Sequence, residues 1–206
     1  MRSHLFICAL LAPLALLAIG CKKKEPDSSQ KSVDVDDVKK TMKSDLLPKV
    51  QAKVPKDLEK KLDFEVGMAA DDRVVAVVPS GWKLSVIKAF EPDDDSFGTK
   101  VWISSNCDGM CTAKDWEKVA DKVDVAGMKT STAELVSDDK LDDGRVVVMK
   151  DKSGSGDDEV RMVVLRWKKD ASRYFACRVE LQGAWVPAQQ AFLDACKGMQ
   201  VVRWGN

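Results

Sequence analysis

The sequence predicts an α+β domain in which helices pack on an antiparallel β-sheet and disulfides cross-link the chain. Short apolar segments follow one another closely and are separated by turn sequences such as Asp142-Asp143-Gly144, which predicts hairpins. Helical patterns stand before, between and after these segments, as is typical of an α+β domain. The final observation is four cysteines in the C-terminal half, an even number that two disulfides require: Cys107, Cys111, Cys177 and Cys196.

The expected strands differ from the expected helices in their apolar period. Alternation and turn residues predict strands over 64–68, 73–78, 82–87, 100–104, 132–137, 145–150, 159–168 and 173–181. Spacings of three and four predict helices over 33–47, 113–123 and 187–197, and Pro48 is expected to end the first of them. A second, weaker helical pattern over 50–62 is interrupted by Pro55.

The first 20 residues are predicted to be a secretory leader. They combine a basic start at Arg2 with an apolar run that is too short to cross a membrane comfortably. The segment Leu16-Leu17-Ala18-Ile19-Gly20-Cys21 resembles the lipobox of bacterial lipoproteins, with Ala18 where leucine is usual. The resemblance implies cleavage before Cys21, a diacylglycerol on its thiol and acylation of its new amine. The alternative is an ordinary signal peptide cleaved near Gly20, which leaves a free cysteine.

Four segments follow from these patterns. We expect a lipoprotein signal peptide over 1–20, a lipidated flexible tether over 21–32, a helical linker over 33–61 and an α+β globular domain over 62–206. The tether has no apolar side chain to bury between Lys22 and Gln30. Lys22 directly after the lipid cysteine resembles lipoproteins that are sorted to the outer membrane. We therefore expect the protein to be lipid-anchored in the cell envelope, at the outer membrane, with its domain in the periplasm or at the cell surface.

Composition excludes several function classes. Basic and acidic residues are equal in number, 33 each, whereas a nucleic-acid partner requires a basic face. The single histidine, His4, lies in the leader, so the mature chain has no Ser-His-Asp or Cys-His catalysis and no imidazole metal site. We expect no enzyme activity, no cofactor and no metal.

The disulfide pairing is predicted from the faces on which the cysteines lie. Cys177 shares one face of the strand over 173–181 with Phe175 and Val179, and Cys196 follows Phe192 by one helical turn. Both cysteines therefore point toward the same core, which predicts a Cys177–Cys196 disulfide and leaves Cys107 to pair with Cys111.

Cys107 and Cys111 also admit a chemical role. A thiol pair before a helix favours the thiolate, and Met110 between the two adds a soft ligand for Cu(I). The three intervening residues and the absence of a distal histidine favour a structural disulfide instead.

A resemblance to the PsbP-like α/β/α sandwich is carried by Val78-Pro79-Ser80-Gly81-Trp82 and by the strand–helix–strand end over 174–202, within residues 62–206. It implies a curved antiparallel sheet with helices on its faces, and a binding or assembly role rather than catalysis. The two disulfides are not part of that family's pattern.

The sequence thus yields two hypotheses for function. The first is a lipid-anchored envelope protein that acts as a non-enzymatic binding or scaffold subunit, with the membrane and an envelope protein as partners. The alternative is a periplasmic thiol-redox or copper-handling protein that works through Cys107 and Cys111. Six tryptophans are expected mostly in the core, although one or two at a sheet edge would line a hydrophobic or peptide-binding groove.

Overall fold

The computed structural model describes residues 33–93, 98–107, 115–152, 154–169 and 171–204. Cys21, Cys111 and the segments expected as leader and tether lie outside these residues, and so does Met110. Among the described residues, no helix is both long enough and apolar enough to cross a membrane.

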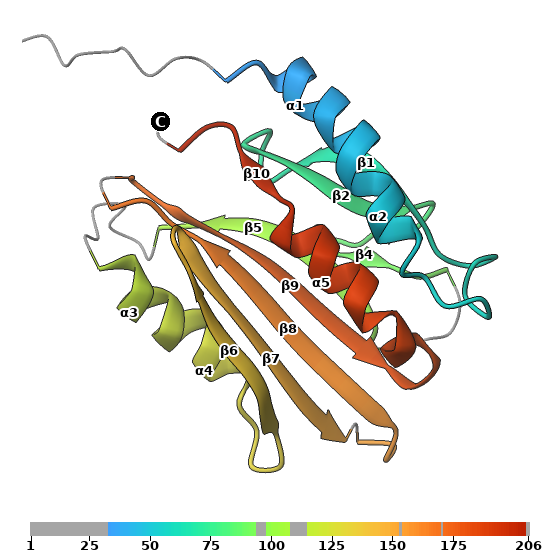
Figure 1. Ribbon diagram of the computed structural model, residues 1–206. Coiled ribbons are helices and arrows are strands. Elements are labelled where there is room, and N and C mark those ends of the chain that lie inside the picture. Colours follow the sequence, from blue (N-terminus) through green and yellow to red (C-terminus); the bar gives the residue numbers. More distant parts are fainter. Residues whose placement is uncertain (1–32, 94–97, 108–114, 153, 170, 205–206) are drawn as a thin grey trace, which may run out of the picture. The chain divides into compact units, whose positions relative to one another are not determined.

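Two antiparallel sheets form the framework (Figure 1). The larger sheet has seven strands in the order β3-β4-β5-β9-β8-β7-β6. Its strands are β3 (Lys83–Leu84), β4 (Phe90–Glu91), β5 (Lys100–Asn106), β6 (Glu134–Leu141), β7 (Gly144–Lys152), β8 (Asp158–Arg166) and β9 (Tyr174–Gln182). The smaller sheet has the order β1-β2-β10, with β1 (Asp63–Ala69), β2 (Val74–Ser80) and β10 (Gln200–Val201).

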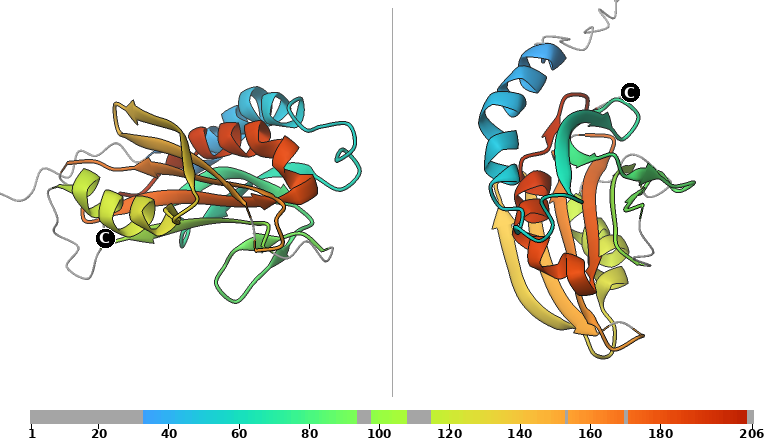
Figure 2. Two further views of the ribbon diagram at one scale, coloured as in Figure 1. Left: turned by 90° about the horizontal axis from the view of Figure 1, so that it is seen from below. Right: turned by 90° about the vertical axis from the view of Figure 1, so that its right-hand side faces the viewer.

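Helices cover both faces of the larger sheet (Figure 2). One face carries α5 (Gln189–Lys197), beside which lie α1 (Val35–Thr41) and α2 (Leu47–Gln51). The opposite face carries α3 (Trp116–Ala120) and α4 (Ala126–Met128), joined by a π turn over Asp121–Val125. The predicted fold class, an antiparallel sheet with helices packed on it, is confirmed.

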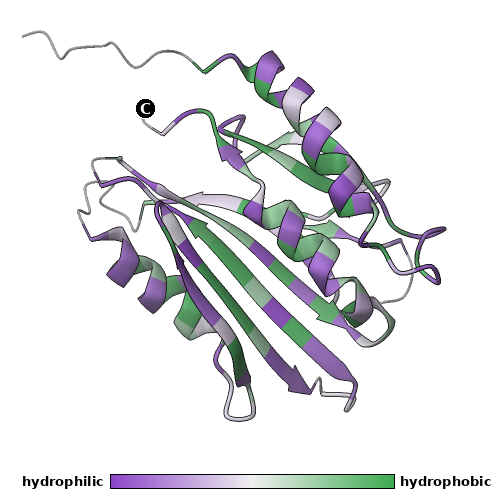
Figure 3. Ribbon diagram, viewed as in Figure 1, coloured by the Kyte–Doolittle hydropathy of each residue, from purple (hydrophilic) through white to green (hydrophobic). Residues whose placement is uncertain are grey.

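Strict alternation along the strands produces the two cores. On β8, Val160, Met162 and Val164 point into the larger core beneath α5, whereas Val163 and Leu165 point into a second core beneath α3. Trp116 and Tyr174 complete this second core, and their ring centroids are 5.3 Å apart. Figure 3 shows apolar residues concentrated along the central strands and hydrophilic residues along α1 and α3.

The N-terminal helix is longer than predicted, because Pro48 does not end it. A π turn over Met42–Leu46 precedes α2, and the Leu47 N–H bonds to the Met42 carbonyl. Pro48 lies in the first turn of α2, where its missing N–H costs least. Residues 33–61, which we expected to form a linker, pack against the sheets. Four of their apolar side chains are buried in the larger core: Met42, Val50, Val54 and Leu58.

The predicted disulfide between Cys177 and Cys196 is present and joins β9 to α5 across 19 residues. Both cysteines are buried in the larger core. Cys107 is also disulfide-bonded. Because Cys111 lies outside the described residues, the Cys107–Cys111 pairing stays a prediction.

Candidate binding groove

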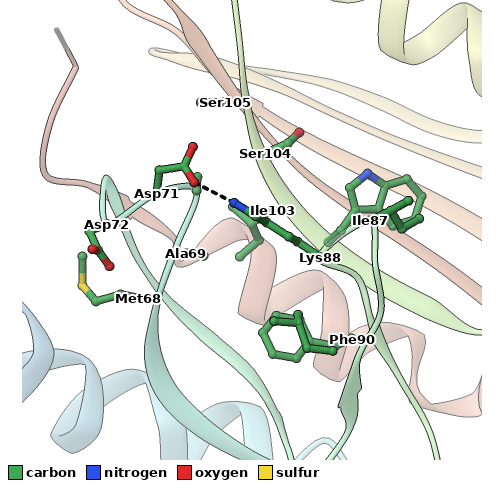
Figure 4. A pocket seen from close by; sticks show the side chains of 13 residues that line it. Met68, Ala69, Asp71, Asp72, Ile87, Lys88, Phe90, Ile103, Ser104 and Ser105 are labelled. Atoms are coloured by element: carbon green, nitrogen blue, oxygen red, sulfur yellow. Dashed lines mark hydrogen bonds and ion pairs between the residues drawn. The ribbon is translucent and has the colours of Figure 1, made fainter. Parts of the chain in front are cut away.

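A groove with a volume of about 350 Å³ lies where the two sheets meet (Figure 4). Its walls are the β1–β2 turn and the β3–β4 hairpin, and strand β5 borders it along one side. We call it the β5 groove and define it by its lining residues: residues 68–72, Leu84, Ile87, Lys88, Phe90 and residues 102–105. Its volume is at the lower end of the range for ligand sites, roughly 300–1,000 Å³.

Strained backbone is concentrated at this groove. Of the described residues other than glycine, four have a positive φ, and all four line the groove: Ala70 (51°), Asp71 (55°), Asp72 (59°) and Lys88 (59°). The first three are consecutive and form a left-handed turn, which the Arg73 N–H closes by donating to the Ala69 carbonyl at 3.2 Å. A left-handed conformation costs an L-residue about 1–2 kcal/mol. Strain of this kind collects at functional sites, so its position singles out the β5 groove.

The opposite wall carries exposed apolar side chains. Leu84, Val86 and Ile87 lie at the tip of the β3–β4 hairpin, and Val86 is fully exposed. The tip is a tight turn in which the Lys88 N–H donates to the Ser85 carbonyl and the Ser85 N–H donates to the Ala89 carbonyl, both at 2.8 Å. Three large apolar residues on one exposed turn are unusual for a protein surface and are typical of an interaction site.

An ion pair joins the two walls at the groove. Lys88 Nζ lies 2.8 Å from Asp71 Oδ1, and the side chains approach each other from opposite sides in Figure 4. The hydrogen bond from Lys88, followed by its charge, lowers the pKa of Asp71 below its usual value of 3.8. Both side chains are largely exposed, so this pair adds little stability. Asp72, beside it, has no ion pair or side-chain hydrogen bond among the described residues.

Two cationic side chains contact the ring of Trp102 at the groove, one from its own strand β5 and one from the adjacent strand β9. Lys100 Nζ lies 5.4 Å from its ring centroid and the Arg178 guanidinium 5.8 Å from it, both within cation–π range. Arg178 is the cross-strand partner of Trp102, and Lys100 lies on the same face of β5. Trp102 therefore lines the groove from β5, a strand with neighbours on both sides in the order of the larger sheet, and the two cations restrain its ring.

A buried ion pair anchors Arg178 in turn. Arg178 pairs with Asp124 of the π turn between α3 and α4, and its Nη1 donates to Ser104 Oγ at 2.8 Å. Burial lowers the pKa of Arg178 to about 10, and the charge of Glu180 opposes this effect. Arg178 therefore stays charged at neutral pH. The ion pair links the π turn on one face to β9, and the hydrogen bond to Ser104 links Arg178 to β5, the strand that borders the groove.

The groove's polar groups suit binding better than bond cleavage. Ser104 Oγ accepts a hydrogen bond from Arg178, and Ser105 Oγ accepts one from Arg173 at 3.0 Å. A guanidinium donates hydrogen bonds and does not act as the base that would take a proton from either hydroxyl. In the described part of the chain, no group of three or more His, Cys, Asp or Glu side chains is placed to hold a metal.

The cysteines singled out in the sequence lie outside the groove lining. Cys177 and Cys196 form their buried bridge, and Cys107 follows β5 directly. Cys21 and Cys111 lie outside the described residues, so the lipid site and the thiol pair stay predictions.

The solved structures that match this chain include two proteins at low sequence identity. The Ran-binding protein Mog1p of Saccharomyces cerevisiae matches with a TM-score of 0.46 and 9% identity, over 68% of this chain and 96% of the yeast chain. The PsbP protein CyanoP of Synechocystis matches with a TM-score of 0.36 and 12% identity, over 67% of this chain and 92% of its own. No family model and no curated protein matches the sequence. A PsbP protein is thus among the structural neighbours.

Sequence reasoning missed the groove because it took residues 82–87 for a continuous strand. Only Lys83 and Leu84 are in a strand, and the apolar residues after them form the exposed hairpin tip. The short strand β4, Phe90–Glu91, was not expected. One signal was present in the sequence, since the run Ala70-Asp71-Asp72 has no glycine where a tight hairpin turn usually needs one.

Proposed function

We propose that this chain is a non-enzymatic binding protein of the bacterial cell envelope, with the β5 groove as its partner site and the lipid on Cys21 as its membrane anchor. The observation that carries the binding role is that all four left-handed non-glycine residues of the described chain line one groove. A fold selected for stability alone would place glycine at such positions. The four left-handed residues lie beside an exposed apolar turn, and this combination supports the proposal that the surface is shaped to bind a partner.

The anchor is supported by the sequence and needs its own test. Intact-mass measurement of the protein extracted from membranes reports the acyl chains on Cys21, and Cys21→Ser is the matched variant. We expect the mass of a triacylated mature chain for the wild type and release of the Cys21→Ser variant from the membrane. Two acyl signals or more are needed for stable anchoring, and three acyl chains exceed that requirement.

The binding role is tested by photocrosslinking in the cells that make the protein. A photoreactive residue at Ile87 reports contacts at the groove, and the same residue at Leu135 on edge strand β6 is the control, since the two side chains are similarly exposed, at 67% and 55%. We expect one reproducible crosslinked species at Ile87 that is absent at Leu135 and weakened by Trp102→Ala. Equal crosslinking at both positions would contradict the assignment.

A further inference from the structure

The β5 groove runs along a strand edge whose backbone is unpaired. Strand β5 pairs with β9 over its whole length, from Lys100 opposite Glu180 to Asn106 opposite Tyr174. On its outer side it pairs with β4 at one position alone among the described residues, Val101 opposite Phe90. No described strand neighbours the outer edge beyond Val101, and the groove lies along that edge.

Hydrogen bonding at the far end of β9 indicates which residues of β5 direct their backbone N–H and C=O groups away from β9, toward the outer side of the strand. The Gln182 N–H donates to Thr99 Oγ1 at 3.1 Å, so Gln182 directs its backbone toward the β5 side. Alternate residues of a strand direct their backbone to opposite sides, which assigns the even-numbered residues of β9 to β5. Their partners are the even-numbered residues of β5. The odd-numbered residues of β5 are left facing outward.

Val101 agrees with this assignment, because it is the residue that pairs with β4. The next two outward-facing residues are Ile103 and Ser105, and both line the groove. Each brings one N–H donor and one C=O acceptor, and no backbone hydrogen bond across this edge joins them to any described residue. Two open ladder positions, roughly 7 Å apart, are the backbone complement of an extended chain.

The side chains around this edge define what such a chain would carry. Phe90 and Trp102 offer apolar surface on the groove, and Met68 contributes from the end of β1. Asp72 adds a carboxylate that is unpaired within the described residues, whereas the neighbouring Asp71 is neutralised by Lys88. The surroundings therefore complement alternate apolar side chains and one cationic side chain.

We propose that the β5 groove binds an extended segment of a partner polypeptide, which adds to the larger sheet as a strand beside Ile103 and Ser105. The segment has apolar side chains at alternate positions and a Lys or Arg that reaches Asp72. This inference rests on the proposed function and specifies its partner class. Backbone hydrogen bonds supply the affinity, and the apolar and acidic contacts supply the choice of sequence.

The experiment uses the full chain purified in detergent and random dodecapeptides displayed on phage. Selected peptides are synthesised, and hydrogen exchange is followed for the backbone amides of β5. We expect exchange at Ile103 and Ser105 to slow at least about tenfold with peptide bound, while the even-numbered residues, already bonded to β9, change little. Methylating the peptide nitrogens that face β5 should weaken binding about tenfold, because each methyl removes a ladder hydrogen bond.

Two variants separate backbone from side-chain contributions. Ser105→Pro removes an outward N–H, and proline is tolerated at such an edge position. Ser105→Ala keeps the N–H and removes the hydroxyl alone. We expect about tenfold weaker binding for Ser105→Pro and a clearly smaller loss for Ser105→Ala. Asp72→Lys should weaken those selected peptides that contain a basic residue.

Several outcomes would overturn the inference. They are failure to select any peptide, unchanged exchange at Ile103 and Ser105 with peptide bound, and insensitivity to N-methylation. Binding to phospholipid vesicles that Ile87→Asp abolishes, without peptide binding, would assign the hairpin tip to a membrane surface instead. If crosslinking at Ile87 persists while N-methylation has no effect, the proposed function stands and the strand addition falls. If Ser105→Pro does not fold, the N-methylated peptides decide alone.

Discussion

Replacing Ala70 by glycine tests how much free energy the left-handed turn stores. Ala70 (φ 51°) and its neighbour Ala69, the last residue of β1, are both half-buried against the larger core. Replacing either Ala69 or Ala70 by glycine removes a half-buried methyl group, which costs up to about 0.8 kcal/mol of stability. It also raises the backbone entropy of the unfolded chain, which costs about 0.5–1 kcal/mol more. Ala70→Gly additionally relieves the left-handed cost of about 1–2 kcal/mol, because glycine adopts positive φ freely.

We therefore expect Ala69→Gly to destabilise the domain by about 1–2 kcal/mol and Ala70→Gly to leave its stability nearly unchanged. Urea-induced unfolding measures both free energies, and equal slopes would verify that the same surface is exposed in each variant. The informative quantity is the difference between the two variants, about 1–2 kcal/mol. Equal destabilisation by both substitutions would refute the claim that the groove turn is strained.

Three further predictions concern the framework around the groove. Replacing Cys177 and Cys196 together by alanine removes a cross-link over 19 residues. The chain-entropy model gives a loss of about 3 kcal/mol in the free energy of unfolding, which lowers the midpoint of thermal unfolding by roughly 6–12 °C. A decrease in the midpoint of less than about 2 °C would contradict this prediction. The hydrogen bond from Thr130 is the largest of the effects that lower the pKa of Asp151 to about 2. The ionised carboxylate therefore stabilises the fold above pH 4, and this stabilisation is lost as the pH falls toward 2. Thr130→Val should raise this pKa in a carboxyl NMR titration, and an unchanged midpoint would exclude the bond. A Cβ on Gly144 would clash with a backbone carbonyl of β8, so Gly144→Ala should prevent soluble expression, whereas Gly154→Ala, which meets nothing, should express normally.

Much of the framework could be predicted because it depends on local alternation. The strand over 173–181 shows its two faces in its own residues, and that pattern led directly to the Cys177–Cys196 bridge. The pairing of β6 with β7 and of β8 with β9 was also expected, since turn residues separate the two segments of each pair.

The groove could not be predicted because its features are not local. Alternating apolar residues in 82–87 indicate a strand, but a strand needs a neighbour, and β3 has one for two residues alone. Whether Ile103 and Ser105 are paired depends on where β4 stops, which no single segment encodes. The run Ala70-Asp71-Asp72 indicates a turn but not its left-handed backbone, because neither alanine nor aspartate demands positive φ.

The unpaired edge of β5 also bears on how the protein behaves when many copies are crowded together. Open strand edges invite fusion with the sheet of another molecule, which is the usual route to aggregation. Here the edge is recessed between the β1–β2 turn and the β3–β4 hairpin, with the Lys88–Asp71 ion pair joining the two walls. We expect these walls to hinder the approach of a second folded sheet more than that of a single extended chain. The recess would then limit edge-to-edge association of neighbouring copies at β5.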